Sequence, residues 1–357
     1  MTPLADLLIR RIRAVGPISV ADYMAECLLH PQHGYYATRD PFGAAGDFTT
    51  APEISQMFGE LLGLCLAQSW LDQGSPAPFT LAELGPGRGT MMADILRATR
   101  AVPGFHAAAQ VVLVEASPVL RQVQAQRLHH PSRWIDTVGD LPATPLFLVA
   151  NEFFDALPIR QFQRMQAGWH QRVIGVADAG LRFGLSDPVV TIGAAFADDP
   201  VGTVVEICPA ALSVAASTGA LLRRHGGVAL VADYGGWRSK GDTLQALRQH
   251  CTEDPLENPG EADLTAHVDF EALAAAFKTP RSGMTDQGTV LKRLGIDQRA
   301  ARLAQSLTGA ALQNHLAAHH RLTDPAEMGS LFKMIAFHAP GSPPPPGFDP
   351  PMLDPHA

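Results

Sequence analysis

Short apolar runs alternate with longer amphipathic stretches along the middle of the chain. The short runs have the length and composition of buried strands, and the amphipathic stretches have the spacing of helices with one apolar face. Predicted strands cover Phe79–Glu83, Val111–Glu115 and Leu146–Ala150, and predicted helices cover Thr90–Arg100 and Pro118–Leu128. Alternation of this kind favours a parallel sheet with helices on both faces. The sequence therefore predicts a doubly wound, Rossmann-like α/β core.

The chain before this core is expected to form a helical cap. Apolar residues recur at helical spacing between positions 4 and 12, which indicates an amphipathic helix rather than a signal peptide. Further on, Thr50 is followed three residues later by Glu53, with Pro52 between them. This pattern predicts a capping box at the start of a helix that continues to about Leu71.

After the first part of the core, the pattern of apolar and polar residues changes. Ile159–Phe162 and Gln171–Val176 alternate in the manner of antiparallel strands and suggest an insertion, followed by a helix at about 209–224 and a strand over Gly227–Tyr234. The Pro-rich end from Pro340 is expected to be disordered. The predicted organisation is a helical cap with an active-site loop (1–78), the first part of the core (79–158), an insertion with its connecting helix (159–226), the rest of the core with a helical appendage (227–339) and a disordered tail (340–357).

Composition and charge exclude several classes of protein. Of the 357 residues, 46% are hydrophobic and only 17% are charged, so the chain should fold. The net charge of −8 argues against a nucleic-acid partner, and the apolar run at Ile207–Leu222 is too short and too polar for membrane insertion. The four cysteines have no metal-ligand spacing, and the clustered His315, His319 and His320 fit surface or capping positions better than metal binding, so neither a disulfide framework nor a metal site is expected.

The clearest chemical signal is the glycine loop between the first strand and helix of the core, where Glu83 precedes Gly85, Gly87 and Gly89. Glycines at such a turn let a ligand approach the backbone amides at a helix N-terminus. A dinucleotide fingerprint would need glycine at position 90, where Thr90 stands. The acid before the loop would instead attract an ammonium group, as in S-adenosylmethionine. The plain alternative is a tight strand-to-helix turn.

Acidic residues follow the next two predicted strands. Glu115 ends one of them, 26 residues after Gly89, where a carboxylate can accept both ribose hydroxyls. Glu152 and Asp155 follow another, and at the carboxyl edge of a parallel sheet they would face the same crevice as the glycines. Two carboxylates can grip a guanidinium through paired hydrogen bonds. The alternatives are an ordinary strand end at Glu115 and a capped helix start at Asp155.

A loop before the core offers further polar groups. Asp47 and Glu53 could fold over the crevice, although a capping box on an ordinary helix explains Glu53 better from the sequence alone. Asp233, at the end of a later strand, could line the crevice as well.

Taken together, these segments resemble the MidA family of class I methyltransferases over nearly the whole chain before the Pro-rich tail. The matching motifs are GYY at Gly34–Tyr36, GDFTTAPEISQMFGELLG at Gly46–Gly63, ELGPGRGT at Glu83–Thr90, NEFFDALP at Asn151–Pro158, VADYG at Val231–Gly235 and ADLTAHVDF at Ala262–Phe270. Ala51 stands where many members have serine, and Asn151 replaces a histidine found in some of them.

The resemblance implies a class I methyltransferase sheet with S-adenosylmethionine as cofactor. For the mitochondrial members it implies symmetric dimethylation of an arginine on a respiratory complex I subunit. By position, the three glycines and Glu83 would hold the methionine part of the cofactor, Glu115 the ribose, and Glu152 and Asp155 the substrate, with Glu53 and Asp47 as further catalytic candidates.

The partner implied is a protein that carries the target arginine. With no evident presequence, the expected location is the bacterial cytoplasm, or the mitochondrial matrix if the chain is eukaryotic. Three other functions stay open: methylation of a small molecule, a nicotinamide dehydrogenase, which Thr90 and Glu83 disfavour, and a noncatalytic assembly factor that retains the cofactor fold.

Overall fold

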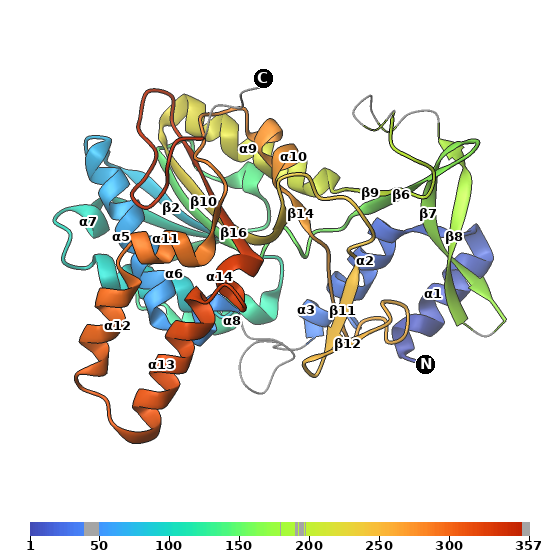
Figure 1. Ribbon diagram of the computed structural model, residues 1–357, viewed down its shortest axis with the longest axis horizontal. Helices are drawn as coiled ribbons and strands as arrows, with labels where there is room; N and C mark the ends of the chain where they lie inside the picture. Colours follow the sequence, from blue (N-terminus) through green and yellow to red (C-terminus); the bar gives the residue numbers. More distant parts are fainter. Residues whose placement is uncertain (39–49, 179, 190–191, 193–195, 197, 352–357) are drawn as a thin grey trace. The chain divides into compact units, whose positions relative to one another are not determined.

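The computed structural model describes residues 1–38, 50–178, 180–189, 192, 196 and 198–351 (Figure 1). Contacts within the chain divide it into two units. The sheet unit comprises Thr49–Phe154, Ser213–Trp237 and Phe270–Ala357, and the second unit comprises Met1–Phe48, Asp155–Leu212 and Arg238–Asp269. Each unit is therefore assembled from three separate stretches of chain.

The sheet unit is built on a mixed sheet with the strand order β15-β16-β10-β5-β2-β3-β4. From β4 to β10 all neighbouring strands are parallel, whereas β16 is antiparallel to both β10 and β15. The strands are β2 (Phe79–Leu84), β3 (Ala109–Val114), β4 (Ser132–Ile135), β5 (Leu146–Asn151), β10 (Gly227–Gly236), β15 (Thr285–Asp286) and β16 (Phe332–His338). This arrangement confirms the predicted α/β fold and brings the carboxyl ends of five parallel strands to one edge.

Helices cover both faces of this sheet (Figure 1). On one face, Leu81 and Phe147 share an apolar cluster with residues of α5 and α6. On the other face, Phe277 of α10 stacks on Phe337 of β16 with ring centroids 3.6 Å apart. The helices are α4 (Ala51–Ile54), α5 (Gln56–Asp72), α6 (Thr90–Thr99), α7 (Phe105–Ala108), α8 (Pro118–Arg127), η1 (Val138–Asp140), α9 (Pro209–His225, from Ser213 in this unit), α10 (Phe270–Phe277), α11 (Gln287–Arg293), α12 (Ile296–Ala304), α13 (Gly309–Thr323) and α14 (Met328–Leu331).

The predicted helix from Thr50 to Leu71 is wrong as a single element. α4 ends at Ile54, and Ser55 is extended, with φ −156° and ψ 135°. Ser55 then caps α5 by accepting a hydrogen bond from the Met57 N–H at 3.3 Å. The predicted capping box is also wrong, because the side chain of Thr50 makes no capping hydrogen bond.

The predicted disorder of the tail is wrong for residues 340–351. Phe348 is buried in the apolar core of the sheet unit. The Cys65 thiol donates to the Pro346 carbonyl at 3.3 Å, and the Gly283 N–H donates to the Asp349 carbonyl at 2.9 Å. Prolines reduce the entropy that this segment loses on folding, and one buried aromatic side chain anchors it. Residues 352–357 lie outside the described part.

The second unit combines short helices with antiparallel strands. The predicted amphipathic first helix is confirmed, and it buries Leu4, Leu8 and Ile12. The predicted strands around residues 159–162 and 171–176 are confirmed as an antiparallel pair. Its elements are α1 (Pro3–Val15), β1 (Ile18–Ser19), α2 (Val20–Leu29), α3 (Tyr35–Thr38), β6 (Arg160–Met165), β7 (Gly168–Ala177), β8 (Gly180–Val189), β9 (Val204–Ile207), β11 (Gln245–Arg248), β12 (Cys251–Glu253), β13 (Asp263–Thr265) and β14 (Val268–Asp269). Among the described residues, no helix has both the length and the apolar character needed to cross a bilayer.

An ion-pair network connects α5, α6 and α12 within the sheet unit. The Glu60 side chain is only 4% exposed and pairs with Arg97 and, at 2.7 Å, with Arg299. Arg97 also pairs with Asp94 at 2.5 Å. Burial opposes ionisation of Glu60, but the hydrogen bonds from the two guanidinium groups outweigh it and lower the pKa of this carboxyl.

We expect Glu60→Gln to lower the free energy of unfolding by about 1–3 kcal/mol at pH 7. The side chains of Arg97 and Arg299 are 44% and 34% exposed, so water can solvate them in part once the carboxylate is gone. Because the folded state lowers the pKa of Glu60, its contribution is complete above the ordinary carboxyl pKa and is lost as the pH falls through the folded value. Urea unfolding should therefore show a smaller difference between wild type and variant in acid. Glu327→Gln, at an exposed carboxylate, is the control; an equal difference at both pH values would contradict the assignment.

Candidate active site

The glycine loop connects β2 to α6 in a backbone conformation that other residues rarely adopt. Gly85, Gly87 and Gly89 have φ values of 58°, 52° and 76°. All three lie in the left-handed region, where a Cβ atom introduces strain. The Gly89 N–H donates to the Pro86 carbonyl at 2.7 Å, and α6 begins at Thr90. The loop thus places the N-terminus of a helix at the carboxyl edge of the sheet.

Glu83 lies in β2 just before this loop and is 2% exposed. Burial raises the pKa of its carboxyl well above the ordinary value, and the nearby charges of Glu115 and Asp94 add to the effect. Among the described residues, its Oε2 atom has no hydrogen-bond partner. A buried carboxylate oxygen of this kind fits an ammonium group of a ligand, in agreement with the predicted cofactor.

Glu115 follows β3, the next strand in the sheet, and is also buried. Its Oε1 accepts from the Ser117 N–H at 2.8 Å, and its Oε2 accepts from Gln124 Nε2 at 3.1 Å. Burial raises the pKa of this carboxyl, while these hydrogen bonds oppose the rise. The carboxylate is therefore held in one orientation at the sheet edge, as a ribose acceptor would need to be.

Gln124 is a residue that the sequence analysis missed. Its side chain is fully buried and bonds to both Glu115 and the glycine loop. The sequence does contain a signal for it, because Gln124 falls four residues after Leu120 on the buried face of α8 and four before Leu128, the buried residue at the C-cap of this helix. A polar residue within an apolar stripe needs a buried hydrogen-bond partner.

Glu53 is directed toward the glycine loop rather than toward its own helix. It accepts a hydrogen bond from the Thr90 hydroxyl, and it lies 3.8 Å from Arg88 and 3.9 Å from Arg127. The structure therefore brings Glu53 to the start of α6, where the sequence alone favoured a local capping role. The capping prediction fails because partners distant in sequence compete for the carboxylate.

Glu152 stands directly after β5 with φ 50°, in the left-handed region. Its Oε1 accepts from the Ala51 N–H at 3.1 Å and from Asn151 Nδ2 at 2.9 Å. A non-glycine residue in this region costs about 1–3 kcal/mol and persists only where surrounding contacts impose it, which is common at functional sites. The Glu152 N–H donates to Ala232 of β10 at 2.9 Å, which helps to impose the conformation.

Asp233 of β10 fixes the segment that follows Glu152. Its Oδ2 accepts from the N–H groups of Phe153 and Phe154 at 3.2 and 2.9 Å, and its Oδ1 accepts from the Tyr234 N–H at 3.2 Å. Burial, together with the charge of Glu152, raises the pKa of Asp233 to about 8. A Cβ atom on Gly85 would lie 2.9 Å from the Phe153 ring, so this segment packs against the glycine loop.

Asp155 and Asp47 lie outside the described part of the sheet unit. Asp47 lies outside the described residues, and Asp155 belongs to the second unit, where it is buried. In that unit its carbonyl accepts from the Ala266 N–H at 3.0 Å, and the Tyr36 hydroxyl donates to Asp263 at 2.8 Å. Burial, and then the charges of Asp263 and Asp155, raise the pKa of Tyr36 well above its ordinary value. The GYY and ADLT motifs therefore meet around Asp155.

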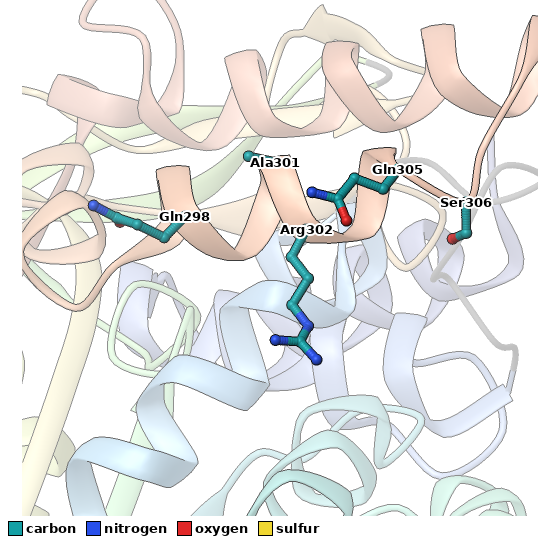
Figure 2. Close-up of a pocket in the computed structure, with 5 residues that line it drawn as sticks. All are labelled: Gln298, Ala301, Arg302, Gln305 and Ser306. Atoms are coloured by element: carbon teal, nitrogen blue, oxygen red, sulfur yellow. The ribbon is translucent and has the colours of Figure 1, made fainter.

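A separate hollow of about 760 Å³ lies along α12 and the residues after it. Figure 2 shows its lining, which consists of Gln298, Ala301, Arg302, Gln305 and Ser306. It is open to solvent and includes none of the glycine-loop or acidic residues described above. A nucleoside needs an enclosed site with convergent polar groups, so this hollow is not the candidate active site.

Comparisons with known proteins agree with this geometry. Residues 61–288 match the family described as "Putative S-adenosyl-L-methionine-dependent methyltransferase". The chain is 38% identical to the mitochondrial protein arginine methyltransferase NDUFAF7 homolog of Drosophila melanogaster, over 93% of this chain and 84% of that protein. It is 36% identical to the mitochondrial protein arginine methyltransferase NDUFAF7 of Homo sapiens, over 94% of this chain and 83% of that protein.

A solved structure supports the same relationship. A COG1565 superfamily member from Burkholderia thailandensis, described as a "likely methyl transferase" and crystallised bound to S-adenosyl-homocysteine, superposes with a TM-score of 0.81 at 30% identity, covering 98% of this chain and 93% of that chain. The glycine loop, the buried Glu83 and the fixed Glu115 carboxylate of this chain fit such a cofactor. The chain therefore belongs to the MidA family of class I methyltransferases, enzymes that use S-adenosylmethionine.

Proposed function

We propose that this methyltransferase transfers a methyl group to a guanidinium nitrogen of an arginine in a protein substrate. The observation that carries the proposal is the position of Glu152, whose carboxylate is fixed at the sheet edge by Ala51 and Asn151 while its neighbour Phe153 packs against the glycine loop. An acid beside the cofactor loop suits a cationic acceptor. The relatives named as protein arginine methyltransferases support the same choice.

Different residues of the sheet unit would hold different parts of the cofactor. When bound, S-adenosylmethionine supplies a methyl group on a positively charged sulfur. The backbone of Gly85, Gly87 and Gly89 would hold the methionine part, and Glu83 would accept a hydrogen bond from its ammonium group. Glu115 would accept the ribose hydroxyls.

Glu152 would compensate for the poor nucleophilicity of the guanidinium group. A guanidinium group has a pKa above about 12 and a delocalised lone pair, so it is a poor nucleophile next to another cation. Glu152 would accept hydrogen bonds from the guanidinium, offset its charge and favour localisation of that charge on the nitrogens it contacts. The nitrogen that attacks would be held about 3–3.5 Å from the methyl carbon. Since proton loss can follow methyl transfer, Glu152 need not be a strong base.

The other acidic residues have different proposed roles. Glu53 contacts Thr90, Arg88 and Arg127, so we assign it to positioning the start of α6. Contact of Asp155 or Asp47 with the acceptor stays a prediction from the family resemblance. The finer proposal for the substrate is an arginine on a respiratory complex I subunit, dimethylated symmetrically. The proposed location is the bacterial cytoplasm, or the mitochondrial matrix if the chain is eukaryotic.

The proposal is tested with S-adenosylmethionine that carries a labelled methyl group, incubated with the enzyme and a protein extract. We expect the label in protein, and recovery of methylated arginine after acid hydrolysis. Excess S-adenosyl-homocysteine should prevent incorporation, and heat-inactivated enzyme is the control. Label found only in small molecules would support the small-molecule alternative, and tight partner binding without incorporation would support a noncatalytic assembly role.

A further inference from the structure

Gln124 links two parts of the cofactor site that are far apart in sequence. From the inner face of α8, its Nε2 donates to the Gly87 carbonyl at 2.7 Å and to Glu115 Oε2 at 3.1 Å. Its Oε1 accepts from Trp134 Nε1 of β4 at 2.7 Å. One fully buried side chain thus contacts the glycine loop after β2, the acid after β3 and an indole on β4.

The indole determines which way the amide points. Trp134 Nε1–H can only donate, so the atom of Gln124 that faces it must be the oxygen. The amide nitrogen is then directed at two acceptors, and each of its two protons has a partner. The neighbours along this stripe, Leu120 and Leu128, are apolar and buried. An aliphatic side chain could fill the same space at position 124. What the glutamine adds to packing is therefore its hydrogen bonds.

These bonds set the geometry of both cofactor-binding groups. In a trans peptide, C=O and the following N–H point in opposite directions. Fixing the Gly87 carbonyl toward α8 therefore directs the Arg88 N–H away from α8. At Glu115, Gln124 holds one carboxylate oxygen and the Ser117 N–H holds the other, so the plane of the carboxylate cannot rotate.

We propose that Gln124 is a positioning residue for the cofactor, which holds the glycine loop and the ribose acid in the geometry that S-adenosylmethionine requires. This inference rests on the proposed assignment of the cofactor to Gly85–Gly89 and Glu115. Gln124 acts through these groups and sets the affinity for the cofactor rather than the rate of the chemical step.

The test is calorimetric titration of the full chain with S-adenosyl-homocysteine. Gln124→Met keeps the volume but removes both donors, and we expect the Kd to rise about 10- to 100-fold. In steady-state kinetics the KM for S-adenosylmethionine should rise while kcat at saturation changes by less than about threefold. Because Gln124 acts through Glu115, the loss in the double variant with Glu115→Gln should be smaller than the sum of the two single losses.

A second variant supplies a signature that a purely structural role would not produce. Gln124→Glu places a carboxylate against Glu115 and the Gly87 carbonyl, where repulsion replaces attraction. Affinity should be lost near neutral pH and partly restored in acid, because the protonated side chain can again donate. Wild type should show no such recovery.

Gln161 offers a matched control, because it is also a fully buried glutamine that donates to carboxylates. Its Nε2 bonds to Glu206 at 2.7 Å and to Asp242 at 2.8 Å in the second unit. Gln161→Met should lower stability but leave the Kd for S-adenosyl-homocysteine within about twofold. Unchanged affinity in Gln124→Met, or equal losses in both variants, would overturn the inference. A wild-type chain that does not bind S-adenosyl-homocysteine would instead refute the cofactor assignment itself.

Discussion

Replacing Glu152 by glutamine is expected to abolish methyl transfer and to leave cofactor binding nearly unchanged. Glutamine keeps an Oε1 atom that can accept from both the Ala51 N–H and Asn151 Nδ2, so the local structure should survive. The negative charge, which the proposed mechanism needs beside the guanidinium, is lost. We expect kcat to fall at least about 100-fold, the scale seen when one group that stabilises transition-state charge is removed.

Two measurements separate this effect from unfolding or loss of cofactor. Calorimetry with S-adenosyl-homocysteine should give a Kd close to that of wild type, and labelled methyl incorporation into protein should disappear. Glu26→Gln, which removes a carboxylate that pairs with Arg11 at 2.7 Å in the second unit, should keep full activity. If Glu152→Gln retains more than half of the wild-type rate, Glu152 does not stabilise the acceptor.

Gly87→Val is expected to eliminate binding of S-adenosyl-homocysteine. At φ 52° a valine is strained, because its branched Cβ conflicts with the backbone in the left-handed region. The added side chain would also block approach of the cofactor to the loop backbone. We expect the Kd to rise by at least about 100-fold, since both effects act on the same contact.

Gly74 provides a control that separates backbone strain from obstruction of the ligand. Gly74 lies in the same unit with φ 82° and has open space around its Cβ position. Gly74→Val should carry a similar backbone strain without obstructing a ligand. Thermal unfolding should show comparable losses of stability for the two variants, while calorimetry should show loss of binding only for Gly87→Val. Equal affinities would remove the glycine loop from the cofactor site.

The parallel core could be predicted from the sequence because its signals are local. Each buried strand is a short apolar run, and each helix has its own amphipathic spacing, so the predicted strand over 79–83 differs from β2 by a single residue at its end. The glycine spacing likewise indicated a close backbone approach, and all three glycines have positive φ. Features of this kind depend on neighbouring residues in the chain.

Features that depend on distant partners could not be predicted. Glu53 has the local pattern of a capping box, yet Thr90 and Arg88 compete successfully for its carboxylate. The composition of the Pro-rich end predicts disorder, but Phe348 is buried in an apolar core formed by earlier segments of the chain. Asp155 follows Glu152 by three residues, and nothing in the sequence indicates that the boundary between the two units falls between them.

The position of β16 has a consequence for synthesis of the protein. β16 pairs with β10 from Val228 to Tyr234, and it comes from Phe332–His338, more than three hundred residues into the chain. Until that segment leaves the ribosome, the nascent sheet presents β10 as an open and strongly apolar edge, which invites pairing with other chains. A premature stop codon upstream of Phe332 would therefore yield an aggregation-prone fragment rather than a slower enzyme.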